Sequence, residues 1–273
     1  MSRGANVRLP AVAGMFYAGE AKTLAGEVTG MLAAAPAADG PVPKALIAPH
    51  AGYMYSGLVA ASVYALLRPA AATIRRVVLL GPTHRVGVRG LALPSVESFA
   101  TPLGRVELDG EAIAALADLP QVVVADAPHA QEHSLEVQLP FLQRVLDDFR
   151  LVPLAVGQAP AEAVAQVLDR LWGGAETLIV VSSDLSHYLP YAEACEIDGQ
   201  TAERILACSP DIGHDEACGA TPLNGLLLAA RRHGLRARLV DLRNSGDTAG
   251  DRRRVVGYGA FAFVDEREAA HAC

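Results

Sequence analysis

Three histidines occupy the same kind of position in this sequence. Each follows, within a few residues, a short apolar run of the kind that forms a buried strand. They are His50, His84 and His187, after the runs 45–48, 74–80 and 177–181. Imidazole is the most common transition-metal ligand in proteins and the usual acid–base group near neutral pH. The pattern therefore predicts a site in which histidines bind a metal, transfer protons, or do both.

A metal held by two neutral histidines usually needs an anionic ligand as well, and the sequence offers several. The candidates are Glu132, Glu136, Asp184 and Cys218. A carboxylate would give the two-histidine, one-carboxylate arrangement of non-haem iron oxygenases, whereas a cysteine thiolate would give a softer site that accepts iron, copper or zinc. The residues by themselves leave these alternatives open, and each histidine taken alone could also be a hydrogen-bonded structural residue.

Two further histidines, His129 and His133, lie in a polar segment that leads into a predicted helix ending near residue 147. Surface or helix-capping roles are expected for them. Tyr53, Tyr55 and Tyr188 are candidate walls of a pocket, because tyrosine combines an apolar ring with a polar end.

The elements that must position these residues follow from the pattern of the chain. Strands that alternate with helices predict a single α/β domain over residues 1–273, with a central, mostly parallel β-sheet flanked by helices. The carboxyl ends of parallel strands open onto a common crevice, so His50, His84 and His187 are expected to converge there. Residues 53–57 are predicted to be a loop. Residues 244–247 are predicted to be a turn between two late strands, 237–242 and 255–264, that pair antiparallel.

Composition and charge exclude several classes of protein. Charged residues make up 19% of the 273 residues, the net charge is −7, and no basic tract is longer than Arg252–Arg254. Nucleic-acid binding and binding to an anionic membrane surface are not expected, because both need clustered Lys and Arg. No apolar run is long enough to span a bilayer, and the first residues lack the apolar core of a signal peptide, so a cytoplasmic location is predicted.

The four cysteines are expected to be reduced thiols. They are Cys195, Cys208, Cys218 and Cys273, and they show neither a disulfide framework nor a CxxC pair. Taken alone, a cysteine such as Cys218 is more often a small core residue than a metal ligand.

Seven segments in a fixed order carry a resemblance to a known family. They read PAVAGMFY, APHAGYMYSG, GPTHR, EHSLEVQLPF, SSDLSHY, ACGATP and SGDTAGDRRRVVGYGAF, and they extend from about Leu9 to Val264. In these segments the chain resembles the Memo family, whose bacterial and archaeal members are named as protein B of the AmmeMemoRadiSam system. The resemblance implies a fold similar to that of class III extradiol dioxygenases, whose active site holds non-haem iron(II) on two histidines and a glutamate.

The resemblance also implies roles for individual residues. Memo proteins resemble the dioxygenase site with a cysteine in place of the glutamate. Carried over segment by segment, His50, His84 and Cys218 would be the metal ligands. His187, in the segment SSDLSHY, would be the acid–base histidine, with Asp184 beside it. The expected metal is iron(II), followed by copper and then zinc.

One segment departs from the family pattern. Many relatives have an arginine in the sequence CGRxP, where this chain has Ala220. A group that could bind an anionic substrate is therefore missing at this position.

Three hypotheses about function follow. The first is metal-dependent redox or oxygenase-type chemistry on an unidentified small molecule or peptide, linked to a radical SAM partner and an AMMECR1-like partner protein. The second is a non-catalytic module that binds a peptide or protein in the same crevice. The third is a zinc hydrolase in which His187 is the general base.

Overall fold

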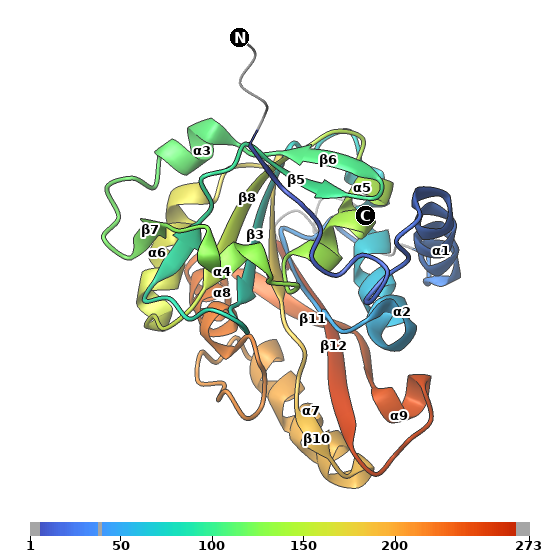
Figure 1. Cartoon of the computed structure of the whole chain (residues 1–273). Helices are drawn as coiled ribbons and strands as arrows, with labels where there is room; N and C mark the ends of the chain where they lie inside the picture. The colour runs from blue at the N-terminus through green and yellow to red at the C-terminus, as the bar shows by residue number, and fades with distance from the viewer. Residues whose placement is uncertain (1–5, 38–39, 266–273) are drawn as a thin grey trace.

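The computed structural model describes residues 6–37 and 40–265, which form a layered α/β fold around a nine-stranded sheet (Figure 1). In chain order, the strands of this sheet are β2 (Ala45–Ala48), β3 (Arg76–Pro82), β4 (Leu91–Leu93), β7 (Val122–Val124), β8 (Arg150–Val156), β9 (Thr177–Ser182), β10 (His187–Leu189), β11 (Leu235–Asn244) and β12 (Val255–Asp265). Their spatial order is β10-β12-β2-β9-β3-β8-β4-β7, with β11 paired to β12.

The centre of the sheet is parallel, as predicted. β2, β9, β3 and β8 are parallel neighbours, and nearly all of their residues are buried. Strands covered on both faces consist of almost continuous apolar residues, which is why these runs stand out in the sequence. Outside this centre the pairing is mixed: β12 runs antiparallel to β2, and β4 runs antiparallel to β8. β11 and β12 are the two late strands, and they pair antiparallel as predicted.

Helices cover both faces of the sheet, so the predicted α/β class is confirmed (Figure 1). The helices are α1 (Ala21–Ala34), α2 (Tyr53–Tyr64), α3 (Gly110–Ala114), α4 (Ala127–Ala130), α5 (Leu139–Val145), α6 (Ala161–Leu171), α7 (Tyr191–Leu206), α8 (Ala220–Arg232) and α9 (Ser245–Thr248), with short 3-10 helices η1 (Ala65–Ala70) and η2 (Glu136–Gln138). Side chains of β2 alternate between two cores: Leu46 packs with α1, α2 and α5, whereas Ile47 packs with α6 and α8.

A smaller, three-stranded sheet lies beside the main one and consists of β1 (Val7–Arg8), β5 (Ser98–Thr101) and β6 (Gly104–Glu107). β1 runs parallel to β5, which brings the side chain of Arg8 to the segment 129–136. Within residues 6–37 and 40–265, no helix is long and apolar enough to cross a membrane. Cys195, Cys208 and Cys218 are free thiols, and Cys273 lies outside the described residues.

Two predicted connections are helical instead. The prediction of a loop at residues 53–57 is wrong, because α2 begins at Tyr53 and includes them. Gly57 packs against Met31 of α1 so closely that a Cβ atom would lie 2.5 Å from the Met31 sulfur, so this glycine permits a helix contact. The prediction of a turn at residues 244–247 holds only in part. Asn244 caps the short helix α9, and Asp247 reaches back to the Asn244 backbone in a capping box.

Candidate metal centre

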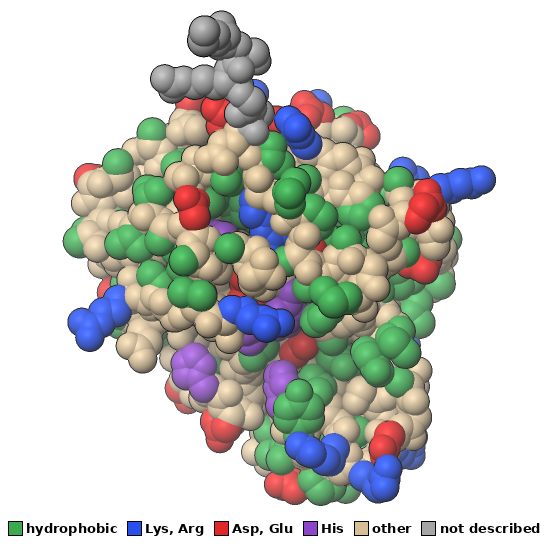
Figure 2. All heavy atoms as spheres, viewed as in Figure 1, with side chains coloured by type: hydrophobic (Ala, Val, Ile, Leu, Met, Phe, Trp, Pro, Cys, Tyr) green, Lys and Arg blue, Asp and Glu red, His purple; other side chains and the backbone are tan. Residues whose placement is uncertain are grey.

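Three adjacent parallel strands bring the predicted histidines to one edge of the sheet. β9 lies between β2 and β3, so the segments that follow these strands are neighbours. His50 follows β2, His84 follows β3, and His187 begins β10 shortly after β9. The centroids of the His50 and His84 rings are 5.1 Å apart. Figure 2 shows histidine side chains gathered near the middle of this face of the molecule.

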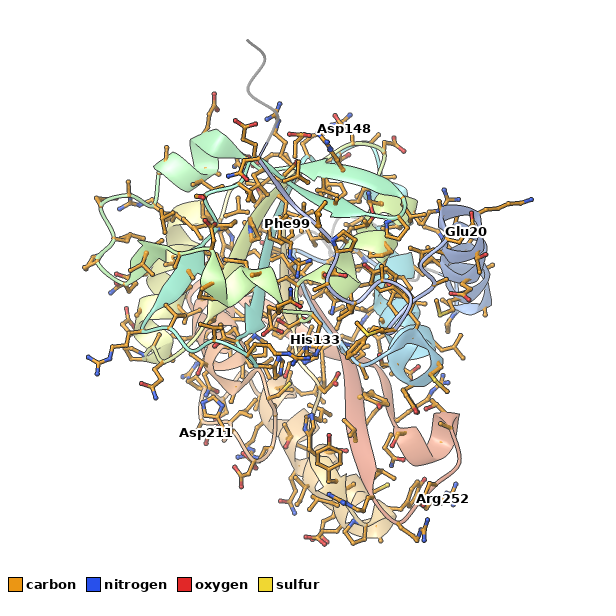
Figure 3. All side chains as sticks on the ribbon, viewed as in Figure 1. Glu20, Phe99, His133, Asp148, Asp211 and Arg252 are labelled. Carbon is orange, nitrogen blue, oxygen red and sulfur yellow. The ribbon has the colours of Figure 1, made fainter. Side chains whose placement is uncertain are left out.

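The imidazole of His133 joins this cluster. In Figure 3, His133 lies near the centre of the view, where side chains from several segments meet. Its ring stacks on that of His84 with centroids 4.7 Å apart and meets the edge of the His50 ring at 5.3 Å. One ring nitrogen from each of His50, His84 and His133 lies within 4.8 Å of the others, a spacing suited to a single metal ion. The surface or capping role predicted for His133 is therefore wrong.

Hydrogen bonds assign the proton on the His50 ring. His50 is fully buried, and its Nδ1 lies 2.9 Å from Ser182 Oγ. The Ser182 hydroxyl donates its own proton to Ser134 O and accepts a hydrogen bond from Gln138 Nε2. It can therefore only accept from the Nδ1–H of His50. The Nε2 atom of His50 is left unprotonated and available to a metal.

The His84 ring is arranged in the same sense. Its Nδ1 lies 2.9 Å from Glu132 Oε1. A carboxylate only accepts hydrogen bonds, so Nδ1 carries the proton and Nε2 is free. Burial opposes ionisation of Glu132, but the hydrogen bonds from His84 outweigh it and lower the pKa of Glu132 to about 2. Glu132 was a candidate anionic ligand, and the structure places it on the Nδ1 side of the ring.

Two of the three clustered histidines are held neutral at pH 7. Burial is the main cause that lowers the pKa of His50 well below its usual value, and the neighbouring His133 and His84 add to the effect. Burial also lowers the pKa of His133 to about 4, although Glu132 acts in the opposite direction. Metal ions bind the neutral form of imidazole, so these rings need not lose a proton first.

Cys218 lies against the cluster. Its Sγ is 3.2 Å from His50 Nε2, so the thiol can donate a hydrogen bond to this unprotonated nitrogen, and both atoms are of the types that ligate a transition metal. Burial raises the pKa of the Cys218 thiol to about 12, and the nearby Asp184 adds to the effect. Without a metal the thiol therefore keeps its proton, and it would release that proton on binding one. The predicted ligand Cys218 thus contacts the predicted ligand His50.

Asp184 supports the loop that carries His50. Its Oδ1 accepts a hydrogen bond from the backbone N–H of His50 at 2.7 Å. Burial raises the pKa of Asp184 to about 7, in spite of the hydrogen bonds from His50 and Ala51. The sequence placed Asp184 beside His187, and both line the same cavity. The Nδ1 atom of His187, however, donates to Leu185 O at 2.7 Å.

His187 lines the cavity beside the cluster. Because Nδ1 donates to a carbonyl, Nε2 is the acceptor. Burial is the main cause that lowers the pKa of His187, which keeps the ring neutral at pH 7. The cavity has a volume of about 690 Å³, and its aromatic walls are Phe16, Tyr55, Tyr188 and Tyr258. A neutral imidazole in such a place can accept a proton from a bound molecule.

Glu136, another candidate anionic ligand, has a structural task. Its fully buried carboxylate accepts hydrogen bonds from the side chain of Arg8, the backbone N–H groups of Ala11 and Val12, and the Tyr17 hydroxyl. These donors all belong to the N-terminal segment. Glu136 therefore anchors that segment to η2.

The same residues are covered by a match to a known family. A sequence profile of the family described as Memo-like protein matches residues 8–262. This chain belongs to the Memo family. Among its relatives, a MEMO1 family protein of Archaeoglobus fulgidus is 36% identical, with 94% of this chain and 99% of the relative covered.

Two further relatives are similar over comparable lengths. A MEMO1 family protein of Methanosarcina mazei is 39% identical, over 93% of this chain and 98% of the relative. One from Aquifex aeolicus is 35% identical, over 94% of this chain and 99% of the relative. The family predicted from the seven sequence segments is thus confirmed. Memo proteins have a dioxygenase-like fold, which agrees with the α/β architecture of this chain.

Proposed function

We propose that this Memo family member binds one transition metal ion through His50, His84 and Cys218 and supports redox or oxygenase-type chemistry. The arrangement of the donor atoms carries this proposal. One ring nitrogen from each of His50, His84 and His133 lies within 4.8 Å of the others, and the Cys218 sulfur is 3.2 Å from His50 Nε2. Two imidazoles and a thiolate form a donor set for iron, copper or zinc, and iron(II) is our first choice, followed by copper.

The neighbouring residues of the chain have defined tasks in this proposal. A bound metal ion would supply the redox chemistry. His187 accepts a proton at Nε2 or returns it, because its Nδ1 is fixed on Leu185 O. Asp184 holds the backbone of His50 in place. The aromatic walls of the cavity, including Phe16, orient an organic substrate beside the cluster and limit its contact with water.

Metal analysis of anaerobically purified protein tests the proposal. We expect about one equivalent of iron or copper in the wild type and a large loss in both His50→Ala and Cys218→Ala. Cys208→Ala is the matched control, because Cys208 is buried in the core formed by α6 and α8, and its metal content should not change. Wild-type protein without iron or copper, or unchanged content in Cys218→Ala, would contradict the proposed ligand set.

His133 and Cys218 compete for the third position at the metal. We expect Cys218→Ala to lose more metal than His133→Ala. A thiolate-to-metal charge-transfer band in the absorption spectrum should persist in His133→Ala and disappear in Cys218→Ala. The opposite pattern would make the ligand set three histidines.

A second candidate function is favoured by the shape of the cavity. Its aromatic walls extend beyond the histidines to Arg254, whose guanidinium lies 5.1 Å from the centroid of the Tyr188 ring. Such a wall suits a peptide or protein segment that binds without a metal. This function would be favoured if the His50→Ala variant still bound the expected radical SAM or AMMECR1-like partner in a pull-down. Zinc in the purified protein together with hydrolytic turnover would instead favour a hydrolase. The partners and the cytoplasmic location stay predictions.

A further inference from the structure

One carboxylate contacts both His84 and His133 of the cluster. Glu132 is 1% exposed and accepts hydrogen bonds from two separate segments of the chain. Its Oε2 accepts the backbone N–H of His84 at 2.6 Å, and its Oε1 lies 2.9 Å from His84 Nδ1. The same Oε1 accepts the backbone N–H groups of His133 and Ser134, at 2.9 and 3.0 Å. It also lies 3.2 Å from His133 Nδ1.

These contacts fix which nitrogen the His84 ring presents. His84 turns Nδ1 toward the acceptor-only carboxylate of Glu132, so this ring carries its proton there and directs the Nε2 lone pair away from Glu132. Glu132 holds His133 through the backbone N–H, and the His133 ring lies beside the carboxylate. The rings stack with centroids 4.7 Å apart, which agrees with their being held from one side.

The backbone of Glu132 is held in turn by the N-terminal strand β1. Arg8 donates to the carbonyl groups of both Glu132 and His129 and pairs with Glu136. Glu136 is as deeply buried as Glu132 and also accepts several hydrogen bonds, but its partners are all in the N-terminal segment. The two glutamates are thus equally buried carboxylates, but Glu132 accepts hydrogen bonds from the histidine cluster and Glu136 accepts them from the N-terminal segment.

We propose that Glu132 is the positioning residue of the metal centre: it sets the tautomer and the orientation of His84, so that this ligand presents Nε2 to the ion, and it holds the backbone of the neighbouring His133. This inference rests on the proposed metal-binding function. Carboxylates that accept from the outer nitrogen of a ligating histidine typically contribute 10–100-fold to metal affinity, so an effect of about that size is expected here.

The first measurement uses metal-free protein. Long-range ¹H–¹⁵N NMR of the histidine side chains reports which ring nitrogen carries the proton. Wild type and Glu136→Gln should show Nδ1–H at His84. In Glu132→Gln only one of the two former acceptor atoms remains and an NH₂ group faces the other N–H donors, so a fraction of the His84 rings should change to the Nε2–H tautomer. Unchanged tautomers in a folded Glu132→Gln protein would overturn the inference.

The second measurement is affinity for Co²⁺, titrated by its visible absorption under anaerobic conditions. Glu132→Gln should bind about 10–100-fold more weakly than wild type, whereas Glu136→Gln, which reaches the centre only through Arg8, should lose much less affinity. An equal loss in both variants would reduce Glu132 to a structural residue and overturn the inference. If Glu132→Gln does not fold, Glu132→Asp replaces it in both measurements, because it keeps the charge but shortens the reach. It should show the same changes to a smaller extent, and wild-type behaviour would overturn the inference.

The two measurements separate this inference from the function on which it rests. Wild type that takes up no Co²⁺, with tautomers that shift in Glu132→Gln, overturns metal binding and supports the orienting role on the rings. Wild type that binds Co²⁺, with unchanged tautomers and affinity in Glu132→Gln, supports metal binding and overturns the positioning role.

Discussion

Ser182 and Glu132 act in the same way on different histidines. Each accepts a hydrogen bond from an imidazole Nδ1, the serine from His50 and the glutamate from His84. The serine can act only as an acceptor toward His50, because its proton is committed to Ser134 O. At the scale of single residues, Ser182 and Glu132 therefore decide which ring nitrogen of His50 and His84 carries the proton, although neither is a proposed metal ligand.

Ser182→Ala should weaken both the fold and the site. The substitution removes the partner of the buried His50 Nδ1–H and of the buried Ser134 carbonyl, and one of the two acceptors of the Gln138 amide. A buried polar group left without a partner costs about 1–3 kcal/mol, so unfolding in urea should show a loss of at least that size. Metal affinity should fall as well, because the His50 ring is no longer fixed.

Ser98→Ala is the control for Ser182→Ala. Ser98 is equally buried, but its hydroxyl has no hydrogen-bond partner in the part of the chain that the structure describes. Its removal should leave stability and metal affinity nearly unchanged. Equal losses in the two variants would contradict the role given to Ser182.

At the scale of elements, the segment 126–138 contributes more to the site than its short helices suggest. α4 has four residues and η2 has three, lengths at which a helix is not stable by itself. Hydrogen bonds from other elements hold them. His129 of α4 bonds through Nε2 to Ala92 O of β4 at 2.9 Å, and Arg8 of β1 donates to the His129 carbonyl. The position of His133 thus depends on contacts outside its own segment.

The burial of His129 should make this packing sensitive to acid. Burial is the main cause that lowers the pKa of His129 from 6.5 to about 4. Below pH 6.5 His129 is protonated in the unfolded chain, whereas in the folded protein it stays neutral until about pH 4. The unfolding free energy should therefore fall as the pH drops through this window, by about 3 kcal/mol in total from this residue.

Urea unfolding of wild type and His129→Gln at several pH values between about 7 and 4 checks this expectation. This range includes the pKa of His129 in the unfolded chain and its pKa in the folded protein. Glutamine keeps a donor for the Ala92 carbonyl but does not titrate, so the variant should lose less stability on acidification. His133 contributes to the same window, because its pKa is also about 4, so the difference between the two proteins is the quantity that matters. Parallel pH curves would rule out the contribution of His129.

At the scale of the whole molecule, the site joins parts of the fold that are distant in sequence. His50 follows β2 and Cys218 precedes α8, and these two side chains meet although they are 168 residues apart. His84 enters from the end of β3, and His133 from the segment before η2. A metal ion bound here would therefore link both helical layers to the edge of the sheet, and it would bind the folded state alone.

Metal should accordingly raise the melting temperature. A ligand at 100 times its dissociation constant adds about 2.7 kcal/mol to stability, which for a chain of this size corresponds to a rise of about 5–10 °C. Calorimetry with Fe²⁺ under anaerobic conditions should show this rise, and a chelator should reverse it. Mg²⁺, which prefers oxygen ligands, should have no such effect. A similar rise with Mg²⁺, or the full rise in His84→Ala, would speak against binding at the cluster.

The sequence by itself determined the elements that bring the site together. The apolar runs before His50, His84 and His187 are local patterns, and buried parallel strands need nothing more to be recognised. Because such strands share one carboxyl edge, the meeting of His50 and His84 followed directly. The identity of the family also lies in the linear order of its motifs.

Only the tertiary structure decided how the side chains pair. Glu132 was a possible metal ligand in the sequence, yet it accepts a hydrogen bond from His84 Nδ1. Asp184 was expected to be a partner of His187, yet it accepts a hydrogen bond from the backbone of His50. Only the adjacent Glu132 pointed to a role for His133 in the site. A glutamate next to a histidine is too common in sequences to predict such a role. Partners of this kind are fixed by contacts across many residues of sequence and by burial, which excludes water as an alternative partner. A linear pattern does not contain that information.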